Sequence, residues 1–332
     1  MKTKKNLKRL LLKLLKNNEQ QIVELIQKYA KLNKDMWDVE VHKRFIVVTP
    51  KQPDHYPLVC SHYDTVRHTP LSGYKIKEDI ITSIEGALGG DDRCGVAIAL
   101  SLMQDGVLAN YAFFDEEECG AGGSGDFLIE TPWIAKESSC YIGLDRRGHK
   151  DAAVYNYRSN KLMDIVGIYG FKEVSGSMTD VSVIEESFPK ATVNLSVGFN
   201  HEHTSNETIH IDVVMNTLQA MKEIVDKCTG VYFDDLEAFG KYKDSFDYYR
   251  DYDYRNYWDG DKDYVEKEIE KLLRGEDRYT VQEEIRMNCD GCLYFDNEIC
   301  DCCCKNKWDC FYPQDVDELK ALSIWNEIGG DK

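Results

Sequence analysis

Residues 56–65 read Tyr56-Pro57-Leu58-Val59-Cys60-Ser61-His62-Tyr63-Asp64-Thr65. The apolar first half of this segment predicts a buried strand of an α/β sheet. His62 follows the strand, so its imidazole is expected at the carboxyl end of the sheet, where the ligand sites of open α/β sheets lie. Asp64 would point to the same side of the extended backbone, where its carboxylate can hold the second imidazole nitrogen.

The segment Gly89-Gly90-Asp91 leads toward an apolar run over residues 96–103, which predicts a helix over 92–103. The amino end of this helix would face the same rim of the sheet as His62. Two divalent ions that sit about 3.5–4 Å apart need one carboxylate between them. Asp91 is the natural candidate for this bridging ligand.

A pair of adjacent glutamates, Glu117 and Glu118, follows a strand-like run over residues 109–114. Neighbouring side chains on an extended chain point in different directions, so one can bind a metal while the other takes a proton. A carboxylate beside other carboxylates and away from bulk water has a pKa raised toward the working pH. We therefore expect Glu117 to be the general base and Glu118 to be a ligand.

Two further candidate ligands are Asp145, which closes the strand-like run 139–144, and His203 on a polar loop. Each motif alone has an ordinary interpretation: the glutamates as a solvated acidic turn, His201 and His203 as exposed side chains. The five signals occur together at the ends of predicted strands or the start of a helix. Together they predict a two-metal hydrolase, with zinc as the ion best suited to imidazole and carboxylate ligands and Co²⁺ or Mn²⁺ as alternatives.

These residues, over roughly residues 20–228, resemble the co-catalytic di-zinc aminopeptidases and their carboxypeptidase and dipeptidase relatives. The resemblance implies a shared role for Asp91, support of His62 by Asp64 and catalysis by Glu117. The implied metal ligands are His62, Asp91, Glu118, Asp145 and His203.

Asp91-Asp92-Arg93-Cys94-Gly95 and the segment 203–207 are most similar to the glutamyl and tetrahedral aminopeptidase branch. The intervals 64–91 and 145–203 leave no room for an inserted domain, so compact relatives, such as the leucyl-type di-zinc aminopeptidases, are the better model. The presence of His62 argues against the one-zinc, cyclase-like relatives.

The resemblance implies a peptide or small amide substrate cleaved at a chain end, with an aminopeptidase preferred. A carboxypeptidase, a dipeptidase or an N-acyl amidohydrolase would use the same site, and an inactive metal-binding scaffold that recruits partners is the non-enzymatic alternative. Arg146 and Arg147 are candidates to fork onto a substrate carboxylate, with an ordinary surface position as the alternative. Asp180, on the glycine-rich turn 176–180, matches a threonine–aspartate pair of the same branch and is a further substrate-binding candidate.

Apolar runs that alternate with helical segments, among them 92–103 and 211–227, predict an α/β fold with a mixed, mostly parallel sheet between helices. The runs 74–77 and 80–83 predict a hairpin added to that sheet. We expect four parts: a basic amphipathic helix over 1–18, a catalytic domain over 19–230, a Tyr/Asp-rich linker over 231–263, and a helical and cysteine-rich module over 264–332.

The formal net charge of −18 over 332 residues argues against nucleic-acid binding, which relies on basic residues. No run is long and apolar enough to cross a bilayer, and Lys13 interrupts anything like a signal core, so a cytoplasmic location is expected. The basic helix is expected to dock on the domain, with a membrane surface or a partner as the alternative. The oligomeric state is left open.

The chain has twelve cysteines, of which seven lie between 289 and 310. The spacing of Cys289 and Cys292 is typical of a metal knuckle, and Cys302 or Cys303 with Cys310 would complete a structural zinc site. Disulfides, an iron–sulfur cluster and unligated thiols are the alternatives. The remaining cysteines are expected to be small apolar fillers, since a thiol protease based on Cys94 or Cys119 lacks a partner pattern: Cys60, Cys94, Cys119, Cys140 and Cys228.

Overall fold

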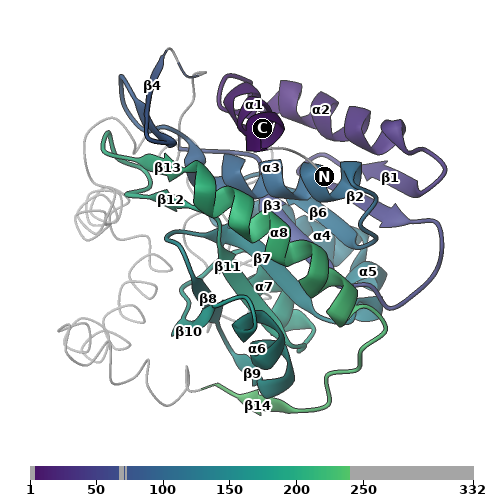
Figure 1. Cartoon of the computed structure of the whole chain (residues 1–332). Coiled ribbons are helices and arrows are strands. Elements are labelled where there is room, and N and C mark those ends of the chain that lie inside the picture. The colour runs from purple at the N-terminus through teal and green to yellow at the C-terminus, as the bar shows by residue number, and fades with distance from the viewer. Residues whose placement is uncertain (1–3, 67–70, 72, 240–332) are drawn as a thin grey trace, which may run out of the picture. The chain divides into compact units, whose positions relative to one another are not determined.

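The computed structural model describes residues 4–66, 71 and 73–239 (Figure 1). Its centre is an eight-stranded sheet whose strands, in order across the sheet, are β1 (Trp37–Val41), β2 (Phe45–Pro50), β6 (Asn110–Phe114), β3 (Leu58–His62), β7 (Tyr141–Arg146), β11 (Thr192–Ser196), β8 (Asp151–Val154) and β10 (Lys172–Ser175). The four central strands β6, β3, β7 and β11 are parallel, whereas the pairs β1–β2, β2–β6 and β11–β8 are antiparallel. The predicted mixed α/β sheet is confirmed.

Helices cover both faces of this sheet. One face carries α1 (Lys4–Leu14), α2 (Glu19–Leu32), α3 (Gly90–Gln104), α6 (Asn160–Gly167) and α8 (Ile211–Cys228), and the other carries α4 (Gly122–Glu130), α5 (Pro132–Glu137) and α7 (Asp180–Ser187). The strands alternate between the two hydrophobic clusters: Val59 joins the first, whereas Leu58 and Cys60 join the second. A continuous apolar run such as 56–60 is therefore what a strand buried on both faces requires.

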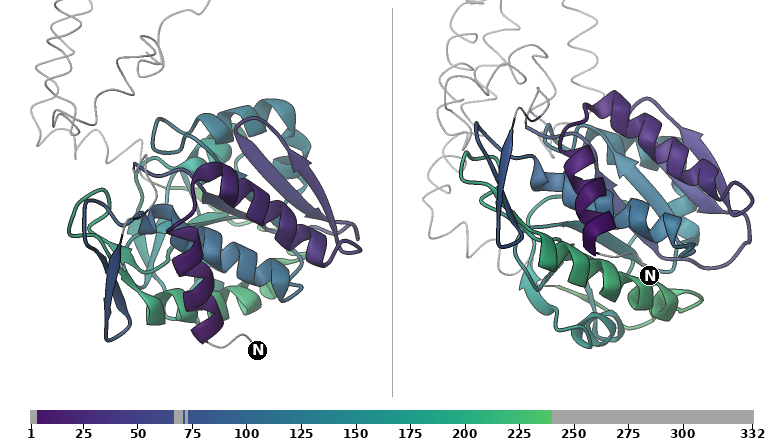
Figure 2. Two further views of the ribbon diagram at one scale, coloured as in Figure 1. Left: turned by 90° about the horizontal axis from the view of Figure 1, so that it is seen from above. Right: turned by 45° about the horizontal axis from the view of Figure 1, so that its top comes forward.

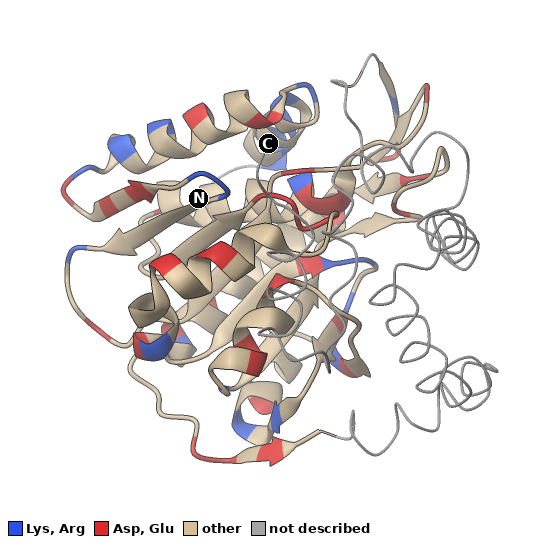
Figure 3. Ribbon diagram, turned by 180° about the vertical axis from the view of Figure 1, so that it is seen from behind, with Lys and Arg blue, Asp and Glu red and all other residues tan. Residues whose placement is uncertain are grey.

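The basic helix α1 packs on the domain through its leucines. Leu7, Leu11 and Leu14 are fully buried in the same cluster as α3 and α8, which α1 contacts. Figure 2 shows α1 lying against α3. Lys and Arg recur along α1 and α2 (Figure 3). On α1, Lys5, Arg9 and Lys13 are exposed, so part of the charged side of the amphipathic helix faces outward.

The hairpin forms as expected from β4 (Tyr74–Lys77) and β5 (Ile80–Ser83), but the prediction that it joins the main sheet is wrong. β5 instead pairs antiparallel with β13 (Thr208–His210), which pairs with β12 (Phe199–Asn200). The cross-strand partners Ile81 and Ile209 are both fully buried, so this pairing buries the one apolar side of each strand. The resulting four-stranded sheet holds the chain on both sides of His203.

The folded part continues beyond residue 230. Phe233 is buried, and β14 (Leu236–Ala238) pairs with β9 (Tyr157–Ser159). The remainder of the expected linker and the cysteine-rich module, with Cys289, Cys292, Cys302, Cys303 and Cys310, lie outside the described residues. Within the part that the structure describes, no helix is long and apolar enough to span a membrane.

The five cysteines of the described domain divide into two kinds. Cys60, Cys94, Cys140 and Cys228 are buried, as expected of small apolar fillers. Cys119 is exposed, so the expectation that it fills the core is wrong. It lies not in β6 but in the turn that follows this strand, where the chain has left the core.

Candidate metal centre

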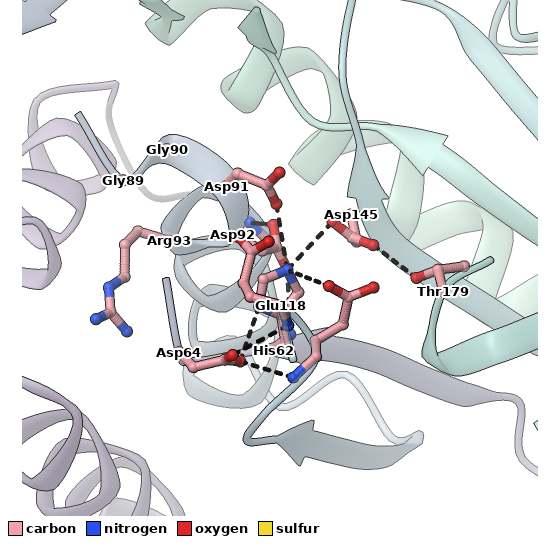
Figure 4. A network of polar contacts seen from close by, with 12 residues as sticks. His62, Asp64, Gly89, Gly90, Asp91, Asp92, Arg93, Glu118, Asp145 and Thr179 are labelled. Atoms are coloured by element: carbon pink, nitrogen blue, oxygen red, sulfur yellow. Dashed lines mark hydrogen bonds and ion pairs between the residues drawn. The ribbon is translucent and has the colours of Figure 1, made fainter. Parts of the chain in front are cut away.

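The five expected ligands converge at the carboxyl ends of the central strands. Figure 4 shows four of them, His62, Asp91, Glu118 and Asp145. Each of the five comes from a different element. They are His62 at the end of β3, Asp91 at the start of α3, Glu118 after β6, Asp145 in β7 and His203 in the loop between β12 and β13. Parallel strands place these ends at one edge, so segments far apart in sequence meet there.

The ligands form two groups that share Asp91. In the first, His62 Nε2 lies 3.2 Å from Asp91 Oδ1 and 3.4 Å from Asp145 Oδ1. In the second, His203 Nε2 lies 3.2 Å from Asp91 Oδ2 and 2.9 Å from Glu118 Oε2. Within each group, one ligand atom per residue lies within 4.8 Å of the others. The two oxygens of Asp91 thus face different groups, which is the arrangement that a bridging carboxylate needs.

Asp92, the residue after Asp91, ties the helix to the strand. Its Oδ1 accepts a hydrogen bond from Gly95 N at 2.8 Å, and its Oδ2 accepts one from His62 N at 3.3 Å. The peptide bond between Asp91 and Asp92 is cis. A Cβ at Gly95 would lie 1.9 Å from the Leu144 carbonyl oxygen, so α3 can approach β7 this closely only with glycine at that position.

Asp64 supports both His62 and the glutamate turn. Its Oδ1 lies 3.1 Å from His62 Nδ1, and its two oxygens accept hydrogen bonds from the backbone N–H groups of Glu117 and Glu118 at 3.2 and 3.1 Å. Burial alone would raise the pKa of Asp64, but His62 and these N–H donors lower it below the ordinary value. An ionised carboxylate on Nδ1 leaves Nε2 of His62 directed at the ligand group.

Glu117 lies beside the first group, with Oε2 at 3.9 Å from His62 Nε2. Burial raises the pKa of Glu117 well above its ordinary value; His62 opposes this, whereas the carboxylates of Asp145, Asp180 and Glu118 add to it. The side chain can therefore hold a proton at a pH where an exposed glutamate is ionised.

The donor set fits divalent cations. Burial raises the pKa of Glu118 and of Asp180 to about 7 each. Although burial opposes its charged form, hydrogen bonds to Asp91 and Glu118 raise the pKa of His203 to about 11.

The nearby arginine does not face these carboxylates. Arg93 is directed away from the ligands (Figure 4), and its guanidinium donates to the carbonyl of Tyr63. Buried carboxylates need paired positive charge, and imidazole with carboxylate oxygen is a zinc ligand set.

Next to the ligands, the turn before α7 carries two polar side chains. The Thr179 hydroxyl donates to Asp145 Oδ2 at 2.7 Å. Asp180 is 3 % exposed, and its Oδ1 has no hydrogen-bond partner among the described residues. Each candidate arginine has an acidic neighbour: Arg147 pairs with Glu202 at 2.7 Å, and Arg146 Nε lies 3.6 Å from Asp151, beyond hydrogen-bond distance.

Sequence reasoning missed three contacts that support the site: Asp92 to His62, Thr179 to Asp145, and Glu207 to the backbone before α3. Asp92 had a usable signal, because an aspartate at the start of a predicted helix can cap it. Glu207 had a weaker one, an acidic residue immediately before a strand that enters the core.

No protein-family model and no curated protein sequence matches the chain. Solved structures do. Aminopeptidase PepT from Bacillus cereus matches with a TM-score of 0.57 at 14% identity, over 68% of this chain and 99% of that chain. A tripeptidase from Staphylococcus aureus matches with a TM-score of 0.56 at 14% identity, over 68% of this chain and 98% of that chain. An aminopeptidase from the archaeon Desulfurococcus kamchatkensis matches with a TM-score of 0.53 at 12% identity, over 71% and 99%. The chain therefore has the fold of these aminopeptidases, as the sequence resemblance predicts.

Proposed function

We propose that this protein is a metal-dependent exopeptidase, specifically an aminopeptidase that uses two zinc ions and Glu117 as general base. The observation that carries the proposal is the shared position of Asp91 between two histidine–carboxylate groups. A structural cluster for one ion would not need two such groups around one bridging side chain. The fold likeness to aminopeptidases is consistent with this function.

The two groups divide the ligands between two ions. His62 and Asp145 would hold one, Glu118 and His203 would hold the other, and Asp91 would bind both. When bound, such ions polarise a scissile carbonyl and make a water molecule more acidic.

In the proposed reaction, the remaining chemistry falls to the protein's own side chains. The Glu117 carboxylate takes a proton from the attacking water, and the water oxygen forms a bond to the scissile carbonyl carbon. It then delivers this proton to the amide nitrogen as the C–N bond breaks and the amine leaves. Asp64 keeps the His62 ring in place throughout. The near-complete burial of His62 and Asp64 limits access of bulk water to these groups.

The substrate is a peptide or small amide with a free amino terminus. A buried carboxylate beside the ligands suits an ammonium group, and Asp180 offers an oxygen without a partner among the described residues. Arg146 and Arg147 are less suited to a substrate carboxylate, since each lies near an acidic side chain of its own. The substrate amine is thus proposed to face Asp180.

The test combines metal content with substrate choice. Elemental analysis of zinc per chain and assays on dipeptide amides with free or blocked amino termini are run on the wild type, Asp91→Ala and Glu117→Gln. We expect the wild type to cleave only free amino termini. Asp91→Ala should bind two fewer zinc ions per chain and lose activity, whereas Glu117→Gln should keep the zinc and lose activity. Equal zinc in the wild type and Asp91→Ala would contradict the proposal and favour a scaffold whose zinc lies elsewhere.

A further inference from the structure

The carboxylate of Glu207 is enclosed by backbone N–H groups. The residue is 1 % exposed. Its Oε2 accepts hydrogen bonds from Leu88 N at 2.7 Å and Gly89 N at 2.9 Å, and its Oε1 accepts them from Gly90 N at 2.6 Å and Asp91 N at 3.2 Å. All four donors belong to the turn that leads into α3.

The regular turns of α3 begin only after these donors, because Asp91 and Asp92 have non-helical φ/ψ. The first N–H groups of a helix lack partners within the helix. The residue before α3, Gly89, has a left-handed φ of 78° and makes no side-chain cap. Glu207, 116 residues further on in sequence than Asp91, therefore binds the non-helical entry to this helix with a carboxylate. Asp92 Oδ1 in turn accepts from Gly95 N where the regular helix begins. Charge-assisted hydrogen bonds of this kind are about twice as strong as neutral ones.

The turn is shaped to admit the carboxylate. A Cβ at Gly90 would lie 2.9 Å from Glu207 Oε1 and 2.7 Å from Ile209 Cγ1. Glycine at this position lets the backbone approach the carboxylate, and any other residue would push Glu207 or Ile209 away.

The segment 203–207 contacts Asp91 at both its side chain and its main chain. His203, four residues before Glu207, places its Nε2 at 3.2 Å from Asp91 Oδ2. Glu207 binds the Asp91 backbone N–H. Asp91 is thus held at its main chain by one residue of the segment and faced at its side chain by another.

We propose that Glu207 is a positioning residue that fixes the Asp91 backbone, so that the two oxygens of Asp91 face the two ligand groups. The inference rests on the proposed two-metal function. Glu207 acts through Asp91, without contact to an ion, and its loss would weaken binding at both groups because they share that ligand.

The test is Glu207→Gln in the full chain. The variant has nearly the same shape, but its amide presents N–H groups toward backbone N–H donors and loses the charge. Glu185→Gln is the matched control, because Glu185 is fully buried and accepts hydrogen bonds from the backbone N–H groups of Asn156 and Tyr157 at 2.8 and 3.3 Å, outside both ligand groups. Zinc affinity is measured by competition with a chelator, with Asp91→Ala giving the background from other sites. The melting temperature of each zinc-free protein is measured in parallel.

We expect Glu207→Gln to weaken Asp91-dependent zinc binding by about 10- to 100-fold, the usual effect of losing a residue that orients a ligand. Glu185→Gln should lower the melting temperature of the zinc-free protein but keep the wild-type zinc affinity. Unchanged affinity in Glu207→Gln, or an equal loss in Glu185→Gln, would overturn the inference. If the wild type itself binds no more zinc than Asp91→Ala, the proposed function fails, and with it the role given to Glu207.

A second variant covers the case in which Glu207→Gln does not fold. Gly90→Ala directs a methyl group at Glu207 Oε1 and leaves the charge in place. It should weaken zinc binding in the same direction, and a folded Gly90→Ala protein with wild-type affinity would contradict the positioning role.

Discussion

At the scale of single residues, the contact between Thr179 and Asp145 links the turn before α7 to one half of the metal centre. The hydroxyl donates to Asp145 Oδ2, whereas Asp145 Oδ1 is the oxygen nearest His62 Nε2. The two oxygens of Asp145 therefore have separate partners. The hydrogen bond from Thr179 restricts rotation of the carboxylate. Hydrogen-bonded neighbours commonly orient ligating carboxylates in this way.

Thr179→Val should accordingly weaken zinc binding at the group formed by His62, Asp91 and Asp145, by about 10- to 100-fold. Valine keeps the shape of the side chain and removes only the hydroxyl. Thr179→Ser, which retains the hydroxyl, is the control and should bind zinc like the wild type. Titration of the zinc-free proteins with zinc separates the two groups, since only the binding step of the group with Asp145 should shift. A shift of equal size in the serine variant would argue that the methyl group, not the hydrogen bond, matters.

The candidate ligands could be proposed from the sequence, whereas the residues that contact and support them could not. His62, Glu118 and Asp145 lie at or just beyond the ends of apolar strand runs, and parallel strands bring such ends together. Glu207 is different because its partners are backbone N–H groups 116 to 119 residues away. Every residue except proline carries such a donor, so no side-chain pattern marks the partner in the sequence.

At the scale of elements, the hairpin β4–β5 illustrates what strand patterns leave open. Its bounds follow from the alternation and the turn at Glu78 and Asp79, which both have positive φ. The choice of neighbour does not, since any strand with one apolar side can pair with any edge that offers a matching side. Burial of Ile81 against Ile209 selects β13, and this pairing places the His203 loop beside the main sheet.

Helix α1 provides a test of element docking. Leu11 is fully buried in the cluster that includes α3, so Leu11→Ala should lower the free energy of unfolding by about 2–5 kcal/mol through lost burial and the remaining cavity. Leu12→Ala is the matched control on the same helix, because Leu12 is only partly buried, and its effect should be clearly smaller. Urea denaturation of both variants measures the difference. Equal effects would mean that α1 does not dock through the Leu11 side.

At the scale of the whole molecule, the two hydrophobic clusters and the metal centre have a common origin in the central strands. Strand β3 sends Val59 into one cluster and Leu58 into the other, and it ends at His62. A change at the metal centre therefore bears on elements that carry the core. The closeness of buried or partly buried carboxylates there, such as Asp91, Glu118 and Asp145, costs stability unless positive charge compensates it.

Zinc binding should consequently raise the thermal stability of the domain. A ligand that binds only the native state stabilises it by about 2.7 kcal/mol at a concentration 100-fold above its dissociation constant. For a domain of this size, that corresponds to a rise in melting temperature of about 5–10 °C. Differential scanning fluorimetry of the chelator-treated chain, with and without added zinc, measures the shift. Asp91→Ala retains the cysteine cluster but loses the shared ligand, so its shift should be much smaller; a shift equal to that of the wild type would place the stabilising zinc outside the site of His62 and His203.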